Sequence, residues 1–384
     1  MASIFRLAIE ALGVKHGGGA TVLKDLLAAA LADPRCEEVH VFCSPRGART
    51  FDLPASKKIL ARECAFAEGS KLYRLWWLER RLPGRLRELG CDVLICLSGC
   101  GTGGDACPHL TVVQQSLPFS AEAQKLASKL DRWRIGVLRW GMRRSCRSSC
   151  KVIVQTRVMS EVVGSAFAIP AERIVVCAPS VRRLPDSRAS SATLSPMRAA
   201  RPGQRILYVG NSSAYKNIDT LIDACVRLRQ RRPDLSLLLT LPAEHPAAKI
   251  TGVTFLGYLN EDELAEAYTL ADVFVLPSVQ ETVGLPLLEA MSAGIPVIAA
   301  DRPYAREVCE SAARFFDPRN PADLERNLDL VLSDEELRRT MSAEGLRICE
   351  RRRVADPYGA IIEQAFLAAS ESRDSGFAAL SHAG

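Results

Sequence analysis

The chain has 384 residues, 48% of them hydrophobic and 24% charged, which is typical of a globular protein and excludes a disordered or fibrous one. This length predicts two domains. The net charge of +6 is unevenly spread: residues 1–200 carry 30 Lys and Arg against 17 Asp and Glu, and residues 201–384 carry 20 against 27. We therefore expect the first half alone to meet an anionic partner or surface.

The sequence shows no targeting or membrane-spanning segment. No apolar run approaches the roughly 20 residues that a spanning helix needs. The opening stretch MASIFRLAIEALGV lacks the basic start and the cleavage site of a secretory leader, so we interpret it as a first strand. We expect a cytoplasmic protein, bound peripherally to the inner face of the plasma membrane.

The 13 cysteines are scattered, and none forms a C-x-x-C pair. A local group of Cys91, Cys96, Cys100, Cys107 and His109 invites a metal interpretation, but its irregular spacing matches no common zinc pattern. We expect these cysteines to be small buried apolar residues. No metal site and no cofactor are predicted.

The first half alternates apolar runs with helical patterns, which favours a parallel sheet covered on both faces by helices. We assign residues 1–180 to this first domain. The predicted strands are Ile4–Ile9, Val39–Phe42, Asp92–Leu97, Leu110–Gln114, Val152–Gln155 and Ile174–Cys177. The predicted helices are Thr21–Ala32, Lys71–Leu89, Ala121–Cys150 and Val158–Ala166.

A glycine-rich loop, His16–Ala20 (HGGGA), lies between the first strand and the first helix. Glycines permit a close backbone approach, and the helix N-terminus that follows favours an anion. A plain strand-to-helix turn is an equally good interpretation of this loop alone.

The segment Ala121–Cys150 carries cations at helical spacing beside an apolar stripe that contains Trp133 and Trp140. Basic residues beside tryptophan suit an anionic membrane surface, and Lys71–Arg87 repeats this chemistry. The alternative is a solvated face over an ordinary buried stripe. No nucleic-acid-binding module accompanies the basic residues, so no nucleic acid is expected. The predicted cations are Lys125, Lys129, Arg132, Arg139, Arg143 and Arg147.

Residues 181–204 are rich in Ser, Arg, Pro and Ala without a period, and we interpret them as a linker. A second domain is assigned to residues 205–355, and a C-terminal helix over 356–370 is expected to cross back to the first domain. The predicted strands of the second domain are Arg205–Val209, Leu235–Thr240, Val253–Leu256, Val273–Leu276 and Val297–Ala299. Its predicted helices are Ile218–Gln230, Glu261–Leu270, Pro286–Ala293 and Pro321–Leu332.

The most informative stretch, Ala271–Ala300, predicts strand, loop, helix and strand. Pro286 suits a first helical turn and Gly294 suits the position just past the helix end. The helix N-terminus offers unpaired amides to an anion, and Gly284 allows a ligand to approach them closely. Glu281 and Glu289 bracket this turn. Amides for a diphosphate and acids for hydroxyls predict a sugar-nucleotide site.

A second loop, Tyr208–Asn217 (YVGNSSAYKN), follows the first strand of the same domain. Its strand ends at Gly210, and Lys216 stands just before a helix that Asn217 is expected to cap. Ligands of doubly wound sheets bind outside the carboxyl ends of the strands, where Lys216 would meet a diphosphate. A surface lysine is the alternative.

Together these motifs resemble the retaining glycosyltransferases of family 4, also called group 1, which have the GT-B architecture. The resemblance covers most of the chain and is strongest over residues 205–317, where ETVGLPLLE carries two glutamates seven residues apart and EAMSAGIPVIAAD follows. The fold class that it implies is α/β, with two doubly wound Rossmann-like domains facing across a cleft.

The resemblance also implies roles in donor binding. Lys216 would pair with the donor diphosphate, Glu289 would hold the ribose hydroxyls and Glu281 would contact the transferred sugar. Backbone amides after Glu281, with Gly17 and Gly18 from the opposite domain, would lie near the diphosphate. Those amides belong to Val283, Gly284 and Leu285.

The sequence departs from the family pattern at three positions, and at one of them Val283 replaces the usual phenylalanine or tyrosine before the second glycine. Many relatives have an arginine after the first-strand glycine Gly210, where this chain has Asn211, and many have a histidine or asparagine near Gln115. Gln115 can hydrogen-bond a substrate but cannot act as a base. The string QQSLPF is similar to one in mannosyltransferases of O-antigen and exopolysaccharide assembly, which favours GDP-mannose as donor.

The expected reaction is transfer of a sugar from a nucleotide-sugar donor to a glycan or lipid-linked acceptor. No Asp-x-Asp occurs, so Lys216 and helix amides are expected to replace a divalent metal at the diphosphate. Two alternatives stay open: a nucleotide-sugar 2-epimerase, and a non-catalytic membrane-binding partner of a glycan assembly complex.

Overall fold

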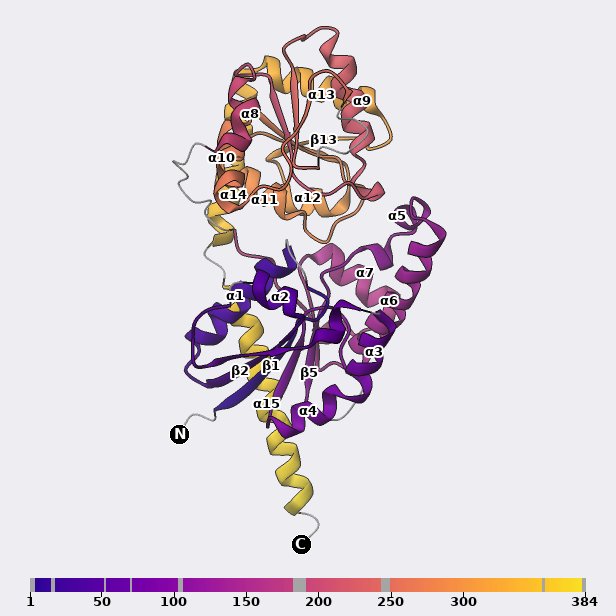
Figure 1. The fold of residues 1–384 in the computed structure, drawn as a ribbon, viewed down its shortest axis with the longest axis vertical. Helices are drawn as coiled ribbons and strands as arrows, with labels where there is room; N and C mark the ends of the chain where they lie inside the picture. Colours follow the sequence, from indigo (N-terminus) through magenta and orange to yellow (C-terminus); the bar gives the residue numbers. More distant parts are fainter. Residues whose placement is uncertain are drawn as a thin grey trace. The chain divides into compact units, whose positions relative to one another are not determined.

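The computed structural model describes residues 4–14, 18–51, 53–69, 71–102, 106–181, 191–242, 249–353 and 356–381. It forms two compact units (Figure 1). The first unit comprises residues 1–119, 129–179 and 356–384, and the second comprises 120–128 and 180–355. The Gly17 position falls outside the described residues.

The first unit contains a seven-stranded parallel sheet in the order β3-β2-β1-β4-β5-β6-β7. Its edge strand β3 is the one that the sequence analysis missed, because its side chains are at most half-buried and its apolar pattern is weak. The strands are β1 Phe5–Glu10, β2 Cys36–Cys43, β3 Ile59–Glu63, β4 Val93–Cys96, β5 His109–Val112, β6 Lys151–Val154 and β7 Ile174–Val176.

Helices cover both faces of this sheet because successive strand side chains point to opposite faces. Leu7 and Ile9 of β1 pack with one layer of helices, and the intervening Ala8 packs with the other. The first layer contains α1 Gly18–Ala32, α2 Pro45–Thr50 and α15 Pro357–Ser381. The second contains α3 Lys71–Arg80, α4 Leu82–Glu88, α6 Lys129–Ser148 and α7 Arg157–Phe167.

The second unit contains a six-stranded parallel sheet in the order β10-β9-β8-β11-β12-β13. Its strands are β8 Arg205–Tyr208, β9 Ser236–Leu239, β10 Val253–Phe255, β11 Val273–Leu276, β12 Val297–Ala300 and β13 Ala313–Phe316. Its helices are α5 Ala121–Lys125, α8 Ser195–Ala199, α9 Ile218–Arg229, α10 Glu261–Leu270, α11 Leu285–Ser292, α12 Pro303–Cys309, α13 Pro321–Ser333 and α14 Glu335–Arg353.

Two helices that were predicted as continuous are each divided. Lys71–Leu89 ends its first part at Arg80 because Pro83 cannot donate a helical hydrogen bond, and α4 restarts with that proline in its first turn. Ala121–Cys150 is divided into α5 and α6 around Ser128. Ser128 just before α6 and Asp131 in its first turn both favour a new helix start.

The segment 181–204, which was interpreted as a linker, is helical over part of its described residues. A 3-10 turn, η4 Ala192–Leu194, leads into α8, and Leu194 and Met197 are fully buried in the core of the second unit. Arg198 of α8 donates to Glu266 of α10 at 2.6 Å. This stretch is too short to show a helical period, and only packing reveals its apolar side chains as core residues.

The C-terminal helix α15 belongs to the first unit and lies beside α1 (Figure 1). Tyr358, Ile361, Ile362 and Ala365 are buried in the same core as β1 and α1. Arg35 binds Glu363 of α15 at 2.6 Å. None of the helices in the described part of the chain is long and apolar enough to cross a membrane.

The buried part of the 181–204 segment predicts a measurable loss of stability. Met197→Ala should lower the free energy of unfolding of the second unit by about 2–5 kcal/mol, because it leaves a cavity in a packed core. Urea unfolding followed by circular dichroism would measure it. The fluorescence transition should stay unchanged, because Trp76, Trp77, Trp133 and Trp140 all lie in the first unit.

The control for this change is Ala199→Ser, an exposed position on the same helix, which should alter stability by less than about 0.5 kcal/mol. Equal effects of the two substitutions would contradict a core role for α8.

Candidate functional site

The second unit joins two predicted site residues in an ion pair. Lys216 Nζ lies 2.5 Å from Glu281 Oε1, and the two side chains are only 10% and 15% exposed. Lys216 follows β8, and Glu281 follows β11, its neighbour in the parallel sheet. The carboxyl ends of neighbouring parallel strands share one edge, which is why residues 65 positions apart meet here.

The loops that carry this pair are held by backbone and side-chain hydrogen bonds. The amide of Val279 in the β11 loop donates to the carbonyl of Tyr215 at 2.9 Å, just before Lys216. At the end of β8, the Gly210 amide donates to Thr240 Oγ1 at 3.0 Å. The buried Tyr208 hydroxyl donates to the Asn211 carbonyl at 2.7 Å. The lysine is therefore placed by an ordered loop.

The two asparagines of this loop act differently from a helix cap. Asn211 Oδ1 accepts from the Ser213 amide at 3.0 Å, which closes a local turn. Asn217 adopts a left-handed conformation with φ of 55°, and its side chain caps no backbone amide of α9. Asn217 thus occupies the predicted N-cap position without making the side-chain bond of a cap. Asn217 instead donates to the Pro318 carbonyl at 2.8 Å and accepts from Thr220.

The glycine before α11 is required by both conformation and space. Gly284 has a φ of 76° and precedes the first turn of the helix, where Pro286 lies as predicted. A Cβ at this position would lie 3.1 Å from Leu276 and Leu287 side-chain atoms. Val283 beside it is buried. At Gly284 the N-terminus of α11 therefore presents backbone without a side chain. The positive end of the helix dipole lies toward the loop that carries Glu281.

Glu289 lies one turn inside α11 and accepts a hydrogen bond from the Tyr268 hydroxyl at 2.8 Å. Sequence analysis missed Tyr268, because a tyrosine in the amphipathic helix α10 looks like any core residue. Tyr268 is fully buried, and burial together with the Glu289 charge raises the pKa of its phenol well above the usual value. The phenol thus stays protonated and holds one carboxylate oxygen of Glu289.

In the first unit, the glycine loop and the loop after β5 lie together. Gly18 is exposed at the start of α1, and Gln115 is exposed after β5. Between them, a Cβ on Gly19 would lie 3.6 Å from Gln114 Oε1. Both predicted positions are therefore accessible at the carboxyl edge of the first sheet.

A buried carboxylate that sequence analysis did not single out supports this edge. Glu10 at the end of β1 accepts from the Leu12 amide at 2.9 Å and from the Ser98 hydroxyl at 2.6 Å. Arg74 of α3 donates to the Leu12 carbonyl at 3.2 Å. Burial raises the pKa of Glu10, partly offset by these bonds. The sequence feature that could have identified Glu10 is a charged residue at the end of an apolar strand.

Only some of the predicted cations lie on an exposed surface of α6. Arg139 is half-buried and donates to the Pro118 carbonyl at 2.6 Å, and Arg147 donates to the Phe167 carbonyl at 3.0 Å. Those two arginines fasten α6 to its neighbours. Lys125 lies in α5, which clusters with the second unit. The predicted cations that are exposed on α6 are Lys129, Arg132, Arg143 and Arg147.

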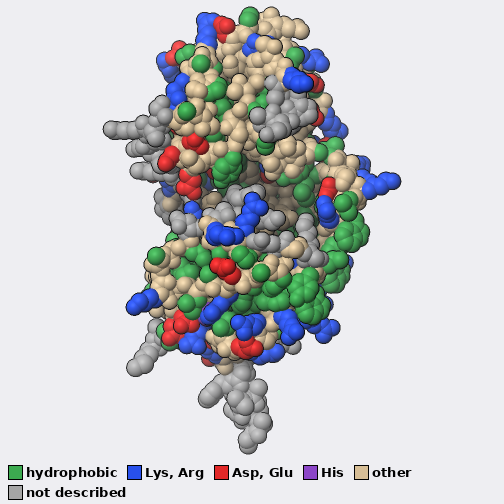
Figure 2. Space-filling view, in the orientation of Figure 1, with side chains coloured by type: hydrophobic (Ala, Val, Ile, Leu, Met, Phe, Trp, Pro, Cys, Tyr) green, Lys and Arg blue, Asp and Glu red, His purple; other side chains and the backbone are tan. Residues whose placement is uncertain are grey.

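Both tryptophans of the apolar stripe of α6 are exposed, which disfavours the alternative of an ordinary buried stripe. Trp133 and Trp140 are 57% and 60% exposed. Helix α3 lies alongside, because Arg144 of α6 binds Glu79 of α3 at 2.8 Å. Apolar and basic side chains gather over these helices in Figure 2. We call this the α3–α6 surface; its exposed apolar members are Leu72, Tyr73, Trp76, Leu130, Trp133 and Trp140.

The local cysteine group lies inside the first unit. Cys91, Cys96 and Cys100 are buried in the core against α3, α4 and α6, and burial raises the pKa of Cys91 to about 12. His109 is buried near the Ser145 carbonyl, and burial lowers its pKa. Within the described ranges, no three His, Cys, Asp or Glu side chains are placed to hold a metal ion together.

Residues 198–347 match the family described as "Glycosyl transferases group 1", and this range includes Lys216, Glu281 and Glu289. The match covers about two-fifths of the chain. The matched range lies in the second unit, which also carries the predicted donor residues.

Two curated relatives share part of the sequence of this chain. An alpha-D-kanosaminyltransferase of Streptomyces kanamyceticus is 24% identical over 72% of this chain and 76% of its own length. O-antigen chain mannosyltransferase B of Escherichia coli is 30% identical over 47% of this chain and 51% of its own length. The chain thus spans about half of the mannosyltransferase.

Two solved structures share the fold of this chain. WaaG, a glycosyltransferase involved in lipopolysaccharide biosynthesis, superposes with a TM-score of 0.71 at 16% identity, covering 94% of this chain and 99% of WaaG. HepE of Anabaena, solved with UDP and glucose, gives 0.67 at 18% identity, covering 94% and 99%. The fold class is GT-B, as expected from the sequence.

The packing around Gly284 predicts how a methyl group just before α11 changes the free energy of unfolding. Gly284→Ala should lower the free energy of unfolding by more than Gly257→Ala. Both glycines have φ near 70°, which costs a non-glycine residue about 1–2 kcal/mol. Only at Gly284 would the new Cβ also crowd leucine side chains. Circular dichroism of urea unfolding measures both; equal losses would show that those leucines yield freely.

Proposed function

We propose that this chain is a glycosyltransferase of surface polysaccharide assembly. It moves a sugar from a nucleotide-sugar donor to a hydroxyl of a glycan or lipid-linked acceptor. The transfer retains the configuration at the anomeric carbon. The observation that carries the proposal is the largely buried Lys216–Glu281 pair at the carboxyl edge of the second sheet. It stands beside a bare helix N-terminus at Gly284.

The proposed reaction breaks the bond between the anomeric carbon and the diphosphate oxygen. It forms a bond from that carbon to the acceptor oxygen, and the acceptor hydroxyl loses its proton. Negative charge develops on the departing nucleoside diphosphate. An ammonium has three donors, so Lys216 can bind Glu281 and phosphate oxygens at once. Amides of Val283, Gly284 and Leu285 add the positive end of the α11 dipole.

In this proposal, each glutamate has a separate role. Glu289, oriented by Tyr268, binds the donor ribose hydroxyls. Glu281 positions Lys216 and contacts the transferred sugar. Gly17 and Gly18 of the first unit serve the donor diphosphate, and Gln115 hydrogen-bonds the substrate. The residues named here do not form a set of metal ligands, and the proposed reaction uses no metal ion.

We propose GDP-mannose as the donor. The string QQSLPF after β5 and the partial similarity to an O-antigen mannosyltransferase support mannose. UDP-glucose is the competing donor, since HepE, which shares the fold, was solved with UDP and glucose.

We further propose that the chain works on the inner face of the plasma membrane. The α3–α6 surface combines exposed tryptophans with exposed Lys129, Arg132 and Arg143. Tryptophan and tyrosine partition to membrane interfaces, and cations attract anionic lipids. A lipid-linked acceptor would then be met where it resides.

The transferase proposal predicts donor cleavage that depends on Lys216. Purified chain should release GDP slowly from GDP-mannose without acceptor, and Lys216→Ala should lower this rate about 100-fold or more, because one preorganised donor to developing charge is lost. Lys249→Ala is the matched control, since Lys249 is the other lysine of residues 201–384 and is exposed. Nucleotide release is measured by chromatography against a UDP-glucose series.

The alternatives give different outcomes in this experiment. Faster release from UDP-glucose would replace the donor and keep the enzyme. Conversion of a nucleotide-sugar to its 2-epimer with no transfer would indicate an epimerase. Donor binding without turnover for any acceptor would indicate a non-catalytic partner and overturn the transferase.

Membrane association predicts a loss of vesicle binding when the tryptophans are removed. Trp133→Gln with Trp140→Gln should weaken co-sedimentation with vesicles of phosphatidylcholine and phosphatidylglycerol at least tenfold, because inserted aromatic area contributes about 25 cal/mol per Å². Tyr258→Gln, an aromatic residue that is 86% exposed in the second unit, is the control. Wild-type chain that stays in the supernatant would contradict the proposal.

A further inference from the structure

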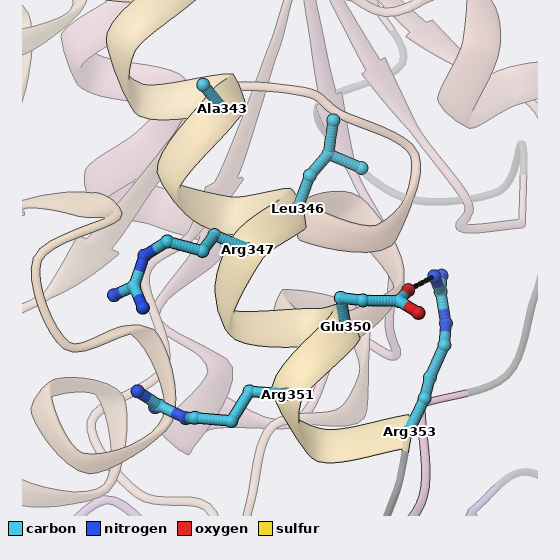
Figure 3. A pocket seen from close by; sticks show the side chains of 6 residues that line it. All are labelled: Ala343, Leu346, Arg347, Glu350, Arg351 and Arg353. Carbon is cyan, nitrogen blue, oxygen red and sulfur yellow. Dashed lines mark hydrogen bonds and ion pairs between the residues drawn. The ribbon is translucent and has the colours of Figure 1, made fainter.

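Two hollows of the structure are lined by arginines, and they differ in how those arginines are paired. The larger, about 670 Å³, lies along α14 (Figure 3). Its arginines bind acids: Arg353 binds Glu350 at 2.7 Å, and Arg351 binds Glu310. Because these charges are already satisfied within the protein, this hollow offers little to an anion.

The smaller hollow, about 320 Å³, lies in the first unit between α3, α4 and the 3-10 turn η1 Ala65–Glu68. One side is aromatic. Phe66 packs against Trp77 with ring centroids 4.8 Å apart and meets the Tyr73 ring edge-on at 5.5 Å. These rings form a rigid apolar wall that opens to the surface.

The same hollow is also lined by Arg80, Arg81 and Arg85. Arg85 binds Glu88 at 2.6 Å on the rim. No ion pair joins Arg80 or Arg81 to an acid within the part of the chain that the structure describes. Arg81 lies over the Trp76 ring at 5.9 Å. Two arginines without acidic partners in the described residues thus line the same hollow as the aromatic rings.

We propose that this hollow, the α3–α4 pocket, binds the phosphate headgroup of an anionic membrane lipid. Guanidinium groups recognise phosphate oxygens through paired N–H donors. The aromatic wall suits the glycerol and first methylenes of the same molecule. The pocket shares Tyr73 with the α3–α6 surface, and its Arg81 lies over the Trp76 ring of that surface, so a bound headgroup would belong to a lipid in the membrane that this surface meets.

This inference rests on the proposed membrane association and adds a defined lipid site to it. Non-specific attraction would use every exposed cation alike, whereas a pocket makes Arg80 and Arg81 count for more than other exposed arginines. Gly84 provides a test of shape, because a Cβ there meets nothing within 4 Å and would extend into open space.

The experiment titrates the full chain with dihexanoyl-phosphatidylglycerol below its micelle concentration and follows the heat of binding. The wild-type chain should bind this lipid and should bind dihexanoyl-phosphatidylcholine at least tenfold more weakly. The double variant Arg80→Gln, Arg81→Gln should bind phosphatidylglycerol at least tenfold more weakly than wild type.

The control is the double variant Arg87→Gln, Arg227→Gln, which removes the same charge. Arg87 is exposed on α4 but does not line the pocket, and Arg227 is exposed on α9. The control should bind like wild type. Gly84→Leu, which changes no charge, should also weaken binding at least tenfold by filling the pocket.

Equal binding by the pocket variant and its control would overturn the proposal, as would equal affinity for the two lipids. Binding of sn-glycerol 1-phosphate as tightly as the lipid would indicate a free phosphate-ester site and overturn the lipid assignment. The titration needs neither vesicle nor donor. Its failure therefore overturns the pocket alone, whereas absent vesicle binding by wild type overturns the membrane proposal.

Discussion

The ion pair between Lys216 and Glu281 is the constraint on which the second unit's strand ends depend. Both side chains are largely buried, and removing either partner would leave an uncompensated charge in a low-dielectric edge. The surrounding loops are accordingly ordered by backbone bonds such as Val279 to Tyr215. A lysine held this way keeps its charge at one place, which is what stabilising a developing phosphate charge requires.

Helix α3 has a comparable position in the first unit, because it serves two surfaces at once. Arg74 points inward to the Leu12 carbonyl, beside the loop that Glu10 holds and that leads to the glycine loop. Tyr73 and Trp76 are exposed on the same helix. A single short helix therefore connects the proposed lipid-facing surface with the loop that precedes Gly18.

Sequence patterns predicted the site where its residues follow strands, and failed where a role arises from packing. Lys216 and Glu281 could be placed together because neighbouring parallel strands end at one edge. Tyr268 could not be assigned to Glu289, since its helix gives no sign of which residue the hydroxyl meets. Arg139 fitted a basic stripe by spacing, yet it packs against Phe119 and Phe167.

The amino-acid sequence by itself determined two doubly wound units, the strand–loop–helix motif around Gly284 and the charge difference between the halves. These features are local or periodic, so short windows carry them. Only the tertiary structure decided that Met197 belongs to a core, that Trp133 and Trp140 are exposed, and that Arg80 and Arg81 flank an aromatic hollow. Each depends on which distant residue comes near, and sequence spacing does not carry that information.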